Sequence, residues 1–248
     1  MRIVLANNRI LSELIADEFI TLVKEKPNAV LGLATGTSPL QIYANLIEAN
    51  KKGLVSFKDV KTFNLDEYIG LEGTHEQSYR YFMNKNLFEQ IDINIENTHV
   101  LKGTGDYLEY AKQYDDEINN AGGIDLQLLG IGSDGHIAFN EPGTSFESLT
   151  HVADLAESTI KDNSRLFNDI SEVPTKAVTM GLKSIMNAKK IVLIATGKNK
   201  AKSIYNLILG KKTEQVPCSI LVDHPDCTIY IDEDAYSLAK EKLGKCRD

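Results

Sequence analysis

The sequence predicts an α/β protein with a doubly wound, mostly parallel sheet that carries helices on both faces. Along its 248 residues, short apolar and β-branched runs alternate with segments whose apolar residues recur at helical spacing, the order expected of βαβ units. Several runs are continuously apolar, as strands are when helices cover both faces of a sheet. A domain holds roughly 150 residues, and because the sequence has no linker or repeat, we expect one domain over residues 1–248.

Each predicted strand is a short run of mainly branched or large apolar residues. Eight are predicted: Arg2–Leu5, Ala29–Ala34, Val60–Asn64, Leu126–Ile131, Ala177–Met180, Lys190–Ala195, Ser219–Val222 and Thr228–Ile231. Three segments between them place apolar residues three and four positions apart, which indicates helices with one buried face. These segments are Asn8–Lys24, Pro39–Lys51 and Gly105–Asn120. In the first of them, Leu11, Ile15 and Phe19 share the apolar face.

The charge and the cysteines exclude several classes of protein. Asp and Glu number 35 against 27 Lys and Arg, a net charge of −8, whereas a general nucleic-acid-binding protein carries a basic face. No apolar run approaches the roughly 18 residues of a membrane span, and the four apolar residues after Arg2 are too few for a secretory signal. Cys218, Cys227 and Cys246 are interpreted as free thiols in a reducing cytosol. We therefore expect a cytoplasmic protein that binds a small molecule, without nucleic acid or membrane.

Open parallel sheets bind ligands beyond the carboxyl ends of their strands, so the segment after each strand matters most. After the second predicted strand, Thr35, Gly36, Thr37 and Ser38 lead into a helix that Ser38 can cap and Pro39 can begin. Free N–H groups and hydroxyls beside a helix N-terminus make a cradle for phosphate. The motif alone slightly favours an ordinary capped turn, because such turns are common.

Two adjacent acids, Asp66 and Glu67, follow the strand that ends at Asn64. A partly desolvated carboxylate at a strand end can act as a base in proton transfer. A carboxylate in this position can equally cap a turn. The sequence favours neither interpretation over the other.

A glycine-rich loop with several titratable groups follows the fourth predicted strand. Residues 130–135 match the G-x-G-x-x-G pattern of dinucleotide-binding sites, but Pro142 leaves no room for the long helix that such a site requires. What remains is Asp134, His136 and Glu141, a histidine between two acids, which suits proton transfer near neutral pH. The other histidines are scattered without the spacing of metal ligands, so no metal site is predicted.

Two cations could bind the same anion as the cradle. Lys200 follows the strand Lys190–Ala195 and stands at a helix start, where a lysine opposes the helix dipole unless an anion is bound. Arg165 lies in a polar stretch and could reach the same anion with its guanidinium group. Lysines are usually solvated at the surface, and that alternative stays open.

These segments together resemble glucosamine-6-phosphate deaminases. The resemblance is carried by Phe-Asn-Leu-Asp-Glu-Tyr at 63–68, Asp-Gly-His-Ile-Ala-Phe-Asn-Glu-Pro at 134–142, Asn-Ser-Arg at 163–165 and Lys200. It implies a Rossmann-like single domain with a lid at about 155–178. It also implies that glucosamine 6-phosphate and water become fructose 6-phosphate and ammonia, with no metal and no organic cofactor.

The resemblance also implies a role for each candidate residue. His136 would open the sugar ring with help from Asp134 and Glu141, and Asp66 would move a proton between carbons 2 and 1. The phosphate would be held by Thr35, Gly36, Thr37, Ser38, Arg165 and Lys200.

Two similar protein classes are weighed against the deaminases. A 6-phosphogluconolactonase has a similar Asp-Gly-His loop but needs no carbon base, and a sugar-phosphate sensor domain of a transcription regulator would need a DNA-binding unit. Some deaminases are hexamers activated by N-acetylglucosamine 6-phosphate, with Arg and Lys where this chain has His151 and Ala153. The resemblance therefore implies an unregulated monomer or small homo-oligomer.

Overall fold

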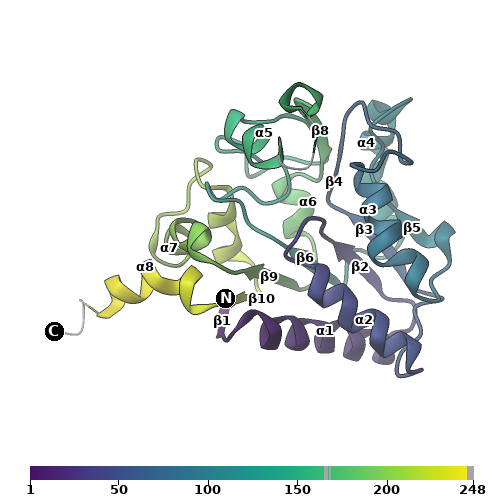
Figure 1. Cartoon of the computed structure of the whole chain (residues 1–248), viewed down its shortest axis with the longest axis horizontal. Helices are drawn as coiled ribbons and strands as arrows, with labels where there is room; N and C mark the ends of the chain where they lie inside the picture. Colours follow the sequence, from purple (N-terminus) through teal and green to yellow (C-terminus); the bar gives the residue numbers. More distant parts are fainter. Residues whose placement is uncertain (165–166, 168, 245–248) are drawn as a thin grey trace.

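The computed structural model describes residues 1–164, 167 and 169–244, and most of its strands lie in one sheet (Figure 1). This main sheet has seven parallel strands in the order β1-β10-β9-β6-β2-β3-β5. The strands are β1 (Arg2–Leu5), β2 (Val30–Leu33), β3 (Lys61–Asn64), β5 (Thr98–His99), β6 (Leu126–Leu129), β9 (Ile191–Ala195) and β10 (Cys227–Ile231). The central strands β2, β6 and β9 are buried throughout, as expected of a sheet covered on both faces.

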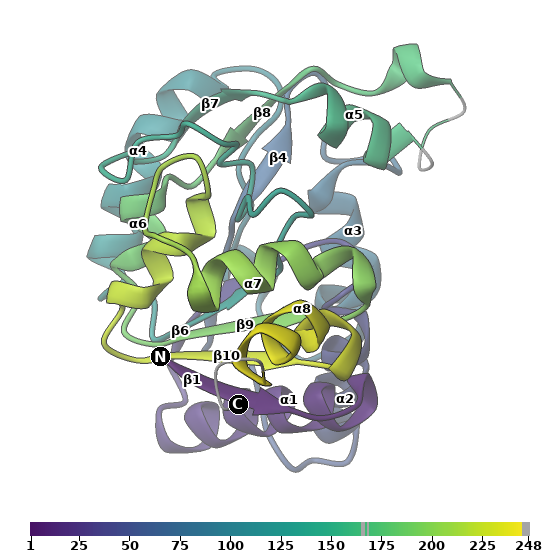
Figure 2. The ribbon, with the colours of Figure 1, turned by 90° about the vertical axis from the view of Figure 1, so that its left-hand side faces the viewer.

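Helices cover the two faces of the main sheet. The longer ones are α1 (Asn8–Glu25), α2 (Leu40–Lys51), α3 (Tyr79–Asn86), α4 (Tyr107–Asn120), α7 (Ala201–Leu209) and α8 (Glu233–Gly244), and α6 (Leu182–Met186) is short. α1 and α2 pack together on one face, and α6, α7 and α8 lie on the other (Figures 1 and 2). The three predicted helices are present within two residues of their predicted ends, and the predicted fold class is confirmed.

Three further strands form a separate antiparallel sheet in the order β4-β8-β7. They are β4 (Asp66–Tyr68), β7 (His151–Asp154) and β8 (Lys176–Thr179), and α5 (Glu157–Asn163) lies between β7 and β8 in the chain. This small sheet lies above the main sheet in Figure 1, near the carboxyl ends of its strands. The predicted strand Ala177–Met180 is β8, but it belongs to the small sheet and not to the parallel one.

One predicted strand is wrong. Ser219–Val222 belongs to a 3₁₀ helix, Pro217–Asp223, in which the N–H of Ser219 donates to the carbonyl of Val216 at 2.8 Å. Pro217 begins this helix because its fixed φ suits a first turn and its missing N–H is not needed there. The thiols of Cys218 and Cys227 are buried and free, as expected, and Cys246 lies outside the described residues.

β2 and β6 are neighbours in the main sheet, and the chain adds its following strands in opposite directions from them. From β2 the chain continues to β3 on one side, and from β6 it continues through the small sheet to β9 on the other. Such a reversal of the strand order leaves a crevice at the carboxyl ends of the two strands.

A buried carboxylate lies at the amino ends of β2 and β6. Asp125 accepts from the ammonium groups of Lys26 and Lys189, at 2.7 Å each, and from the N–H of Val30 at 2.8 Å. No described helix is both long and apolar enough to cross a lipid bilayer.

Candidate active site

A cavity of about 660 Å³ opens at this crevice, a size suited to a small metabolite. Its walls come from the segments after five strands: Asn8 after β1, residues 34–38 after β2, Leu65 and Asp66 after β3, much of 130–139 after β6, and Thr196, Asn199 and Lys200 after β9. Tyr79 of α3 and Thr159 of α5 complete the lining. The strand-end segments singled out in the sequence therefore meet at one place.

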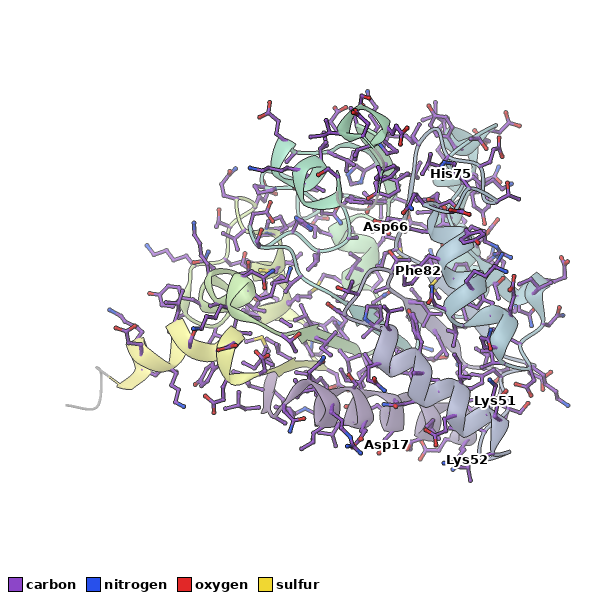
Figure 3. All side chains as sticks on the ribbon, in the orientation of Figure 1. Asp17, Lys51, Lys52, Asp66, His75 and Phe82 are labelled. Carbon is purple, nitrogen blue, oxygen red and sulfur yellow. The ribbon has the colours of Figure 1, made fainter. Side chains whose placement is uncertain are left out.

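Asp66 lies inside the molecule on the wall of this cavity. In Figure 3 it lies well within the outline, whereas Asp17 on α1, Lys51 at the end of α2 and Lys52 directly after it lie at the outer edge. Asp66 is the first residue of β4, and only 6% of it is exposed. Burial, and then the charge of Glu67, raise the pKa of Asp66 to about 8. A carboxylate with a pKa near the working pH is a much stronger base than an exposed one.

The neighbouring Glu67 has a different environment, because consecutive side chains of a strand point to opposite faces. Its carboxylate accepts from the N–H groups of Tyr68, Tyr79 and Arg80 at 2.8, 2.9 and 3.0 Å. The last two donors belong to the first turn of α3, so Glu67 caps that helix. Burial raises the pKa of Glu67 to about 7, although the three N–H groups lower it. Of the two acids considered in the sequence, Glu67 therefore has the capping role, and Asp66 faces the cavity.

His136 is flanked by the two predicted acids. Its Nδ1 lies 2.8 Å from Oδ1 of Asp134 and 3.7 Å from Oε2 of Glu141. The imidazole ring lies directly against Gly132, where a Cβ would come within 2.2 Å of the ring. Gly135, at φ +96°, turns the loop between the acid and the histidine. The loop therefore needs its glycines to bring the ring and the carboxylates together.

The electrostatics of this group keep Asp134 ionised. Burial raises the pKa of Asp134, but the contact with His136 and its positive charge outweigh burial and lower that pKa to about 2. Asp134 is therefore a carboxylate at neutral pH and stabilises an imidazolium beside it. The ligand atoms of Asp134, His136 and Glu141 also lie within 4.8 Å of one another, close enough to hold a metal ion. The geometry alone thus permits either a proton relay or a metal.

Glu141 is held by α5 and its flanking residue. Its Oε1 accepts from the hydroxyl of Thr159 at 2.7 Å and from the N–H of Ala156 at 3.3 Å. The preceding Asn140 is fully buried and donates to the carbonyls of Ile137 and Met180 at 2.9 and 2.8 Å. Sequence reasoning missed Thr159, because its partner lies 18 residues away and no local pattern connects them.

The predicted phosphate cradle lies on the cavity wall, although Ser38 does not cap the helix as predicted. Thr35, Gly36, Thr37 and Ser38 all line the cavity, and Gly36 adopts φ +91°, which favours glycine. α2 begins at Leu40, and its first turn receives no capping hydrogen bond from a side chain, so the Ser38 hydroxyl does not cap this helix. The capping prediction is wrong because Pro39, and not Ser38, is the residue directly before the helix.

Lys200 lines the cavity from the side of β9 and immediately precedes α7. The turn before it is held by Asp232, whose two carboxylate oxygens accept from the N–H of Gly197 at 3.0 Å. Arg165, the other predicted cation, lies outside the described residues. The cavity also contains polar groups that the sequence did not single out: Asn8, Ser133, Tyr79, Thr196 and Asn199.

Known proteins similar to this chain share both its sequence and its fold. Residues 7–230 match the family described as glucosamine-6-phosphate isomerases/6-phosphogluconolactonase. The glucosamine-6-phosphate deaminase of Thermoanaerobacter pseudethanolicus is 56% identical over 221 residues, covering 89% of this chain and 87% of the relative. A solved structure of a monomeric glucosamine-6-phosphate deaminase superposes with a TM-score of 0.93 at 42% identity, covering 96% of this chain and 100% of the other.

A lactonase shares the fold at lower identity. The 6-phosphogluconolactonase of Trypanosoma brucei superposes with a TM-score of 0.77 and is 18% identical, covering 95% of this chain and 97% of the other. At that identity the likeness concerns the fold alone. The match over residues 7–230 and the 56% identity are far more extensive, and this chain belongs to the family of glucosamine-6-phosphate isomerases and 6-phosphogluconolactonases.

Proposed function

We propose that this chain is a glucosamine-6-phosphate deaminase, which converts glucosamine 6-phosphate and water into fructose 6-phosphate and ammonia. The observation that carries the proposal is the buried Asp66, whose pKa is raised to about 8 and which shares a cavity with His136, the histidine that Asp134 and Glu141 flank. The reaction needs a base at carbon 2 as well as a group that opens the ring. The names of the 56% identical relative and of the superposed monomeric deaminase support the same activity.

Ring opening requires a proton to move from the anomeric hydroxyl to the ring oxygen. His136 takes the proton from the hydroxyl and returns it to the ring oxygen. Asp134 and Glu141, at 2.8 and 3.7 Å from Nδ1, stabilise the imidazolium that forms in between. This step yields the open-chain aldehyde.

Isomerisation and deamination follow at carbons 1 and 2. Asp66 removes the proton from carbon 2 and delivers it to carbon 1, while one proton of the ammonium group on carbon 2 passes to the aldehyde oxygen, which becomes a hydroxyl. Carbon 2 is then part of a ketimine, to which water adds, and ammonia leaves as the new carbonyl forms. The substrate's own ammonium group favours the ionised form of Asp66, because an opposite charge nearby lowers a carboxyl pKa.

The phosphate lies far from the bonds that change and serves to orient the sugar. We assign it to the 35–38 loop and to Lys200, with Arg165 as a further contact. Segment 155–178 serves as the lid of a single domain spanning 1–248. We expect a monomer or small homo-oligomer that acts in amino-sugar catabolism in the cytoplasm, including the use of N-acetylglucosamine and N-acetylneuraminate.

The proposal is tested by an ammonia-release assay on glucosamine 6-phosphate, with fructose 6-phosphate measured in parallel. Equal amounts of the two products are expected, and Asp66→Asn should abolish both while leaving substrate binding intact. Hydrolysis of 6-phosphogluconolactone by the same preparation, without ammonia release, would identify the lactonase activity instead. Binding of phosphosugars without turnover of either substrate would indicate a sensor.

A further inference from the structure

Thr159 is the described residue of segment 155–178 that reaches the cavity wall. It lies on α5, and its side chain is almost completely buried, with 4% exposed. A threonine hydroxyl in such a place needs a hydrogen-bond partner. That partner is Oε1 of Glu141, at 2.7 Å.

The two oxygens of Glu141 have separate environments. Oε1 accepts from Thr159 and, at 3.3 Å, from the N–H of Ala156. Oε2 lies 3.7 Å from Nδ1 of His136, is buried, and has no hydrogen-bond partner. A carboxylate that can rotate would turn its second oxygen toward any other donor, so the bonds to Oε1 fix which way Oε2 faces.

The other acid does not depend on α5. Asp134 contacts His136 twice within its own loop, at 2.8 Å to Nδ1 and at 3.0 Å to the backbone N–H. Its position therefore follows from the loop alone, whereas the position of Glu141 depends on two donors from residues 156–159. Of these two donors, the Thr159 hydroxyl makes the shorter bond.

We propose that Thr159 is a positioning residue for the reaction: its hydroxyl holds Glu141 so that the second carboxylate oxygen faces His136. The inference rests on the proposed deaminase activity and extends it to a residue outside the recognised sequence motifs. Thr159 acts through Glu141 on ring opening and not on the phosphate. Its loss should therefore lower kcat and change KM little.

The test compares Thr159→Val, which keeps the shape of the side chain but lacks the donor, with Thr159→Ser, which keeps the donor. Because Thr159→Val removes a hydrogen bond to a charged group, we expect kcat to fall roughly 10- to 100-fold. KM should stay within about threefold, and Thr159→Ser should restore kcat to within about threefold of the wild type. Thr175→Val is the matched control, since Thr175 is an exposed threonine of the same segment.

A double-mutant cycle with Glu141→Gln separates positioning from packing. If Thr159 acts through the charge of Glu141, Thr159→Val should add less than about twofold to the defect of Glu141→Gln. The inference would be overturned if the losses of kcat from Thr159→Val and Glu141→Gln were additive. It would also be overturned if Thr159→Val left kcat unchanged, or if Thr159→Ser lowered kcat as much as Thr159→Val does. If Thr159→Val does not fold, Thr159→Ala in the same cycle gives the same decision. A wild-type chain that releases no ammonia would overturn the proposed function itself, and this inference with it.

Discussion

Replacing Asp66 by Asn should make the protein more stable at neutral and mildly alkaline pH. The carboxyl group is 6% exposed, and burial, followed by the charge of Glu67, raises its pKa from 3.8 to about 8. Between these two pH values the unfolded chain has lost the proton and the native protein keeps it. The native state then binds more protons, so the free energy of unfolding falls as pH rises, by about 1.4 kcal/mol per pH unit.

Over the whole interval this slope amounts to at most about 6 kcal/mol. The effective dielectric constant of buried sites exceeds that of dry protein and the charge of Glu67 changes in the same pH range, so the difference is smaller, and we expect at least about 2 kcal/mol near pH 8. Asparagine has nearly the same shape and does not titrate, so Asp66→Asn lacks the contribution of Asp66 to the slope, whereas the contribution of Glu67 is present in both proteins. The stability gained by the variant over the wild type should therefore grow from about pH 4 to about pH 8 and stay constant above that.

Urea unfolding of both proteins at a series of pH values from about 5 to about 8 measures this difference directly. Asp59→Asn is the matched control, because Asp59 is exposed and its replacement should leave the slope unchanged. The same Asp66→Asn preparation should release no ammonia. A stability difference that stays flat across this pH range would refute the reasoning, since Asp66 would then be ionised in the native protein and an ordinary weak base.

Four further predictions concern the relay, the phosphate, the metal question and regulation. His136→Gln should slow ammonia release by about 10²- to 10⁴-fold but leave some turnover, because the sugar opens slowly in water; a wild-type rate would make His136 purely structural. Lys200→Ala should raise KM for glucosamine 6-phosphate by about 10- to 100-fold with a smaller loss of kcat, and an unchanged KM would contradict the cradle. Prolonged dialysis against a chelator should leave kcat unchanged, and activity recovered only on adding a divalent metal would assign Asp134, His136 and Glu141 to a metal site. Substrate curves should be hyperbolic with and without N-acetylglucosamine 6-phosphate, because His151 and Ala153 cannot replace two fixed cations; sigmoidal curves relieved by that sugar would show otherwise.

The parts of the site that the sequence predicted are those held by local chain. Asp134, His136 and Glu141 lie within eight residues, so the loop that carries them brings them together wherever it is placed. Asp66 and the 35–38 loop follow neighbouring strands, and parallel strands bring their carboxyl ends to one edge of the sheet. Motif spacing therefore predicts the residues that lie close together along the chain, and the hydrophobic pattern predicts the segments that follow neighbouring strands.

The parts that the sequence did not predict depend on contacts between distant segments. β4 and β7 are short and contain charged residues, so no apolar run marks them, and they exist because both pair with β8. The pairing of β4 decides which of Asp66 and Glu67 faces the cavity. Ser219–Val222 looks like a strand by composition, and the proline two residues earlier turns it into a 3₁₀ helix.

The small sheet is what holds the proposed base and the proposed proton relay in a fixed relation. Asp66 pairs with Thr179 of β8, and the hydroxyl of Thr179 accepts from the N–H of Phe139 at 3.1 Å. Asn140 donates to the carbonyl of Met180, the residue that follows β8. β8 therefore holds Asp66 through backbone pairing, and it holds the loop that leads to Glu141 through the Thr179 hydroxyl and the Met180 carbonyl that follows. A shift of β8 by one residue would turn the Thr179 side chain to the opposite face, away from that loop, and would change the residue that pairs with Asp66. The register of β8 therefore sets the position of the proposed base relative to the proposed relay.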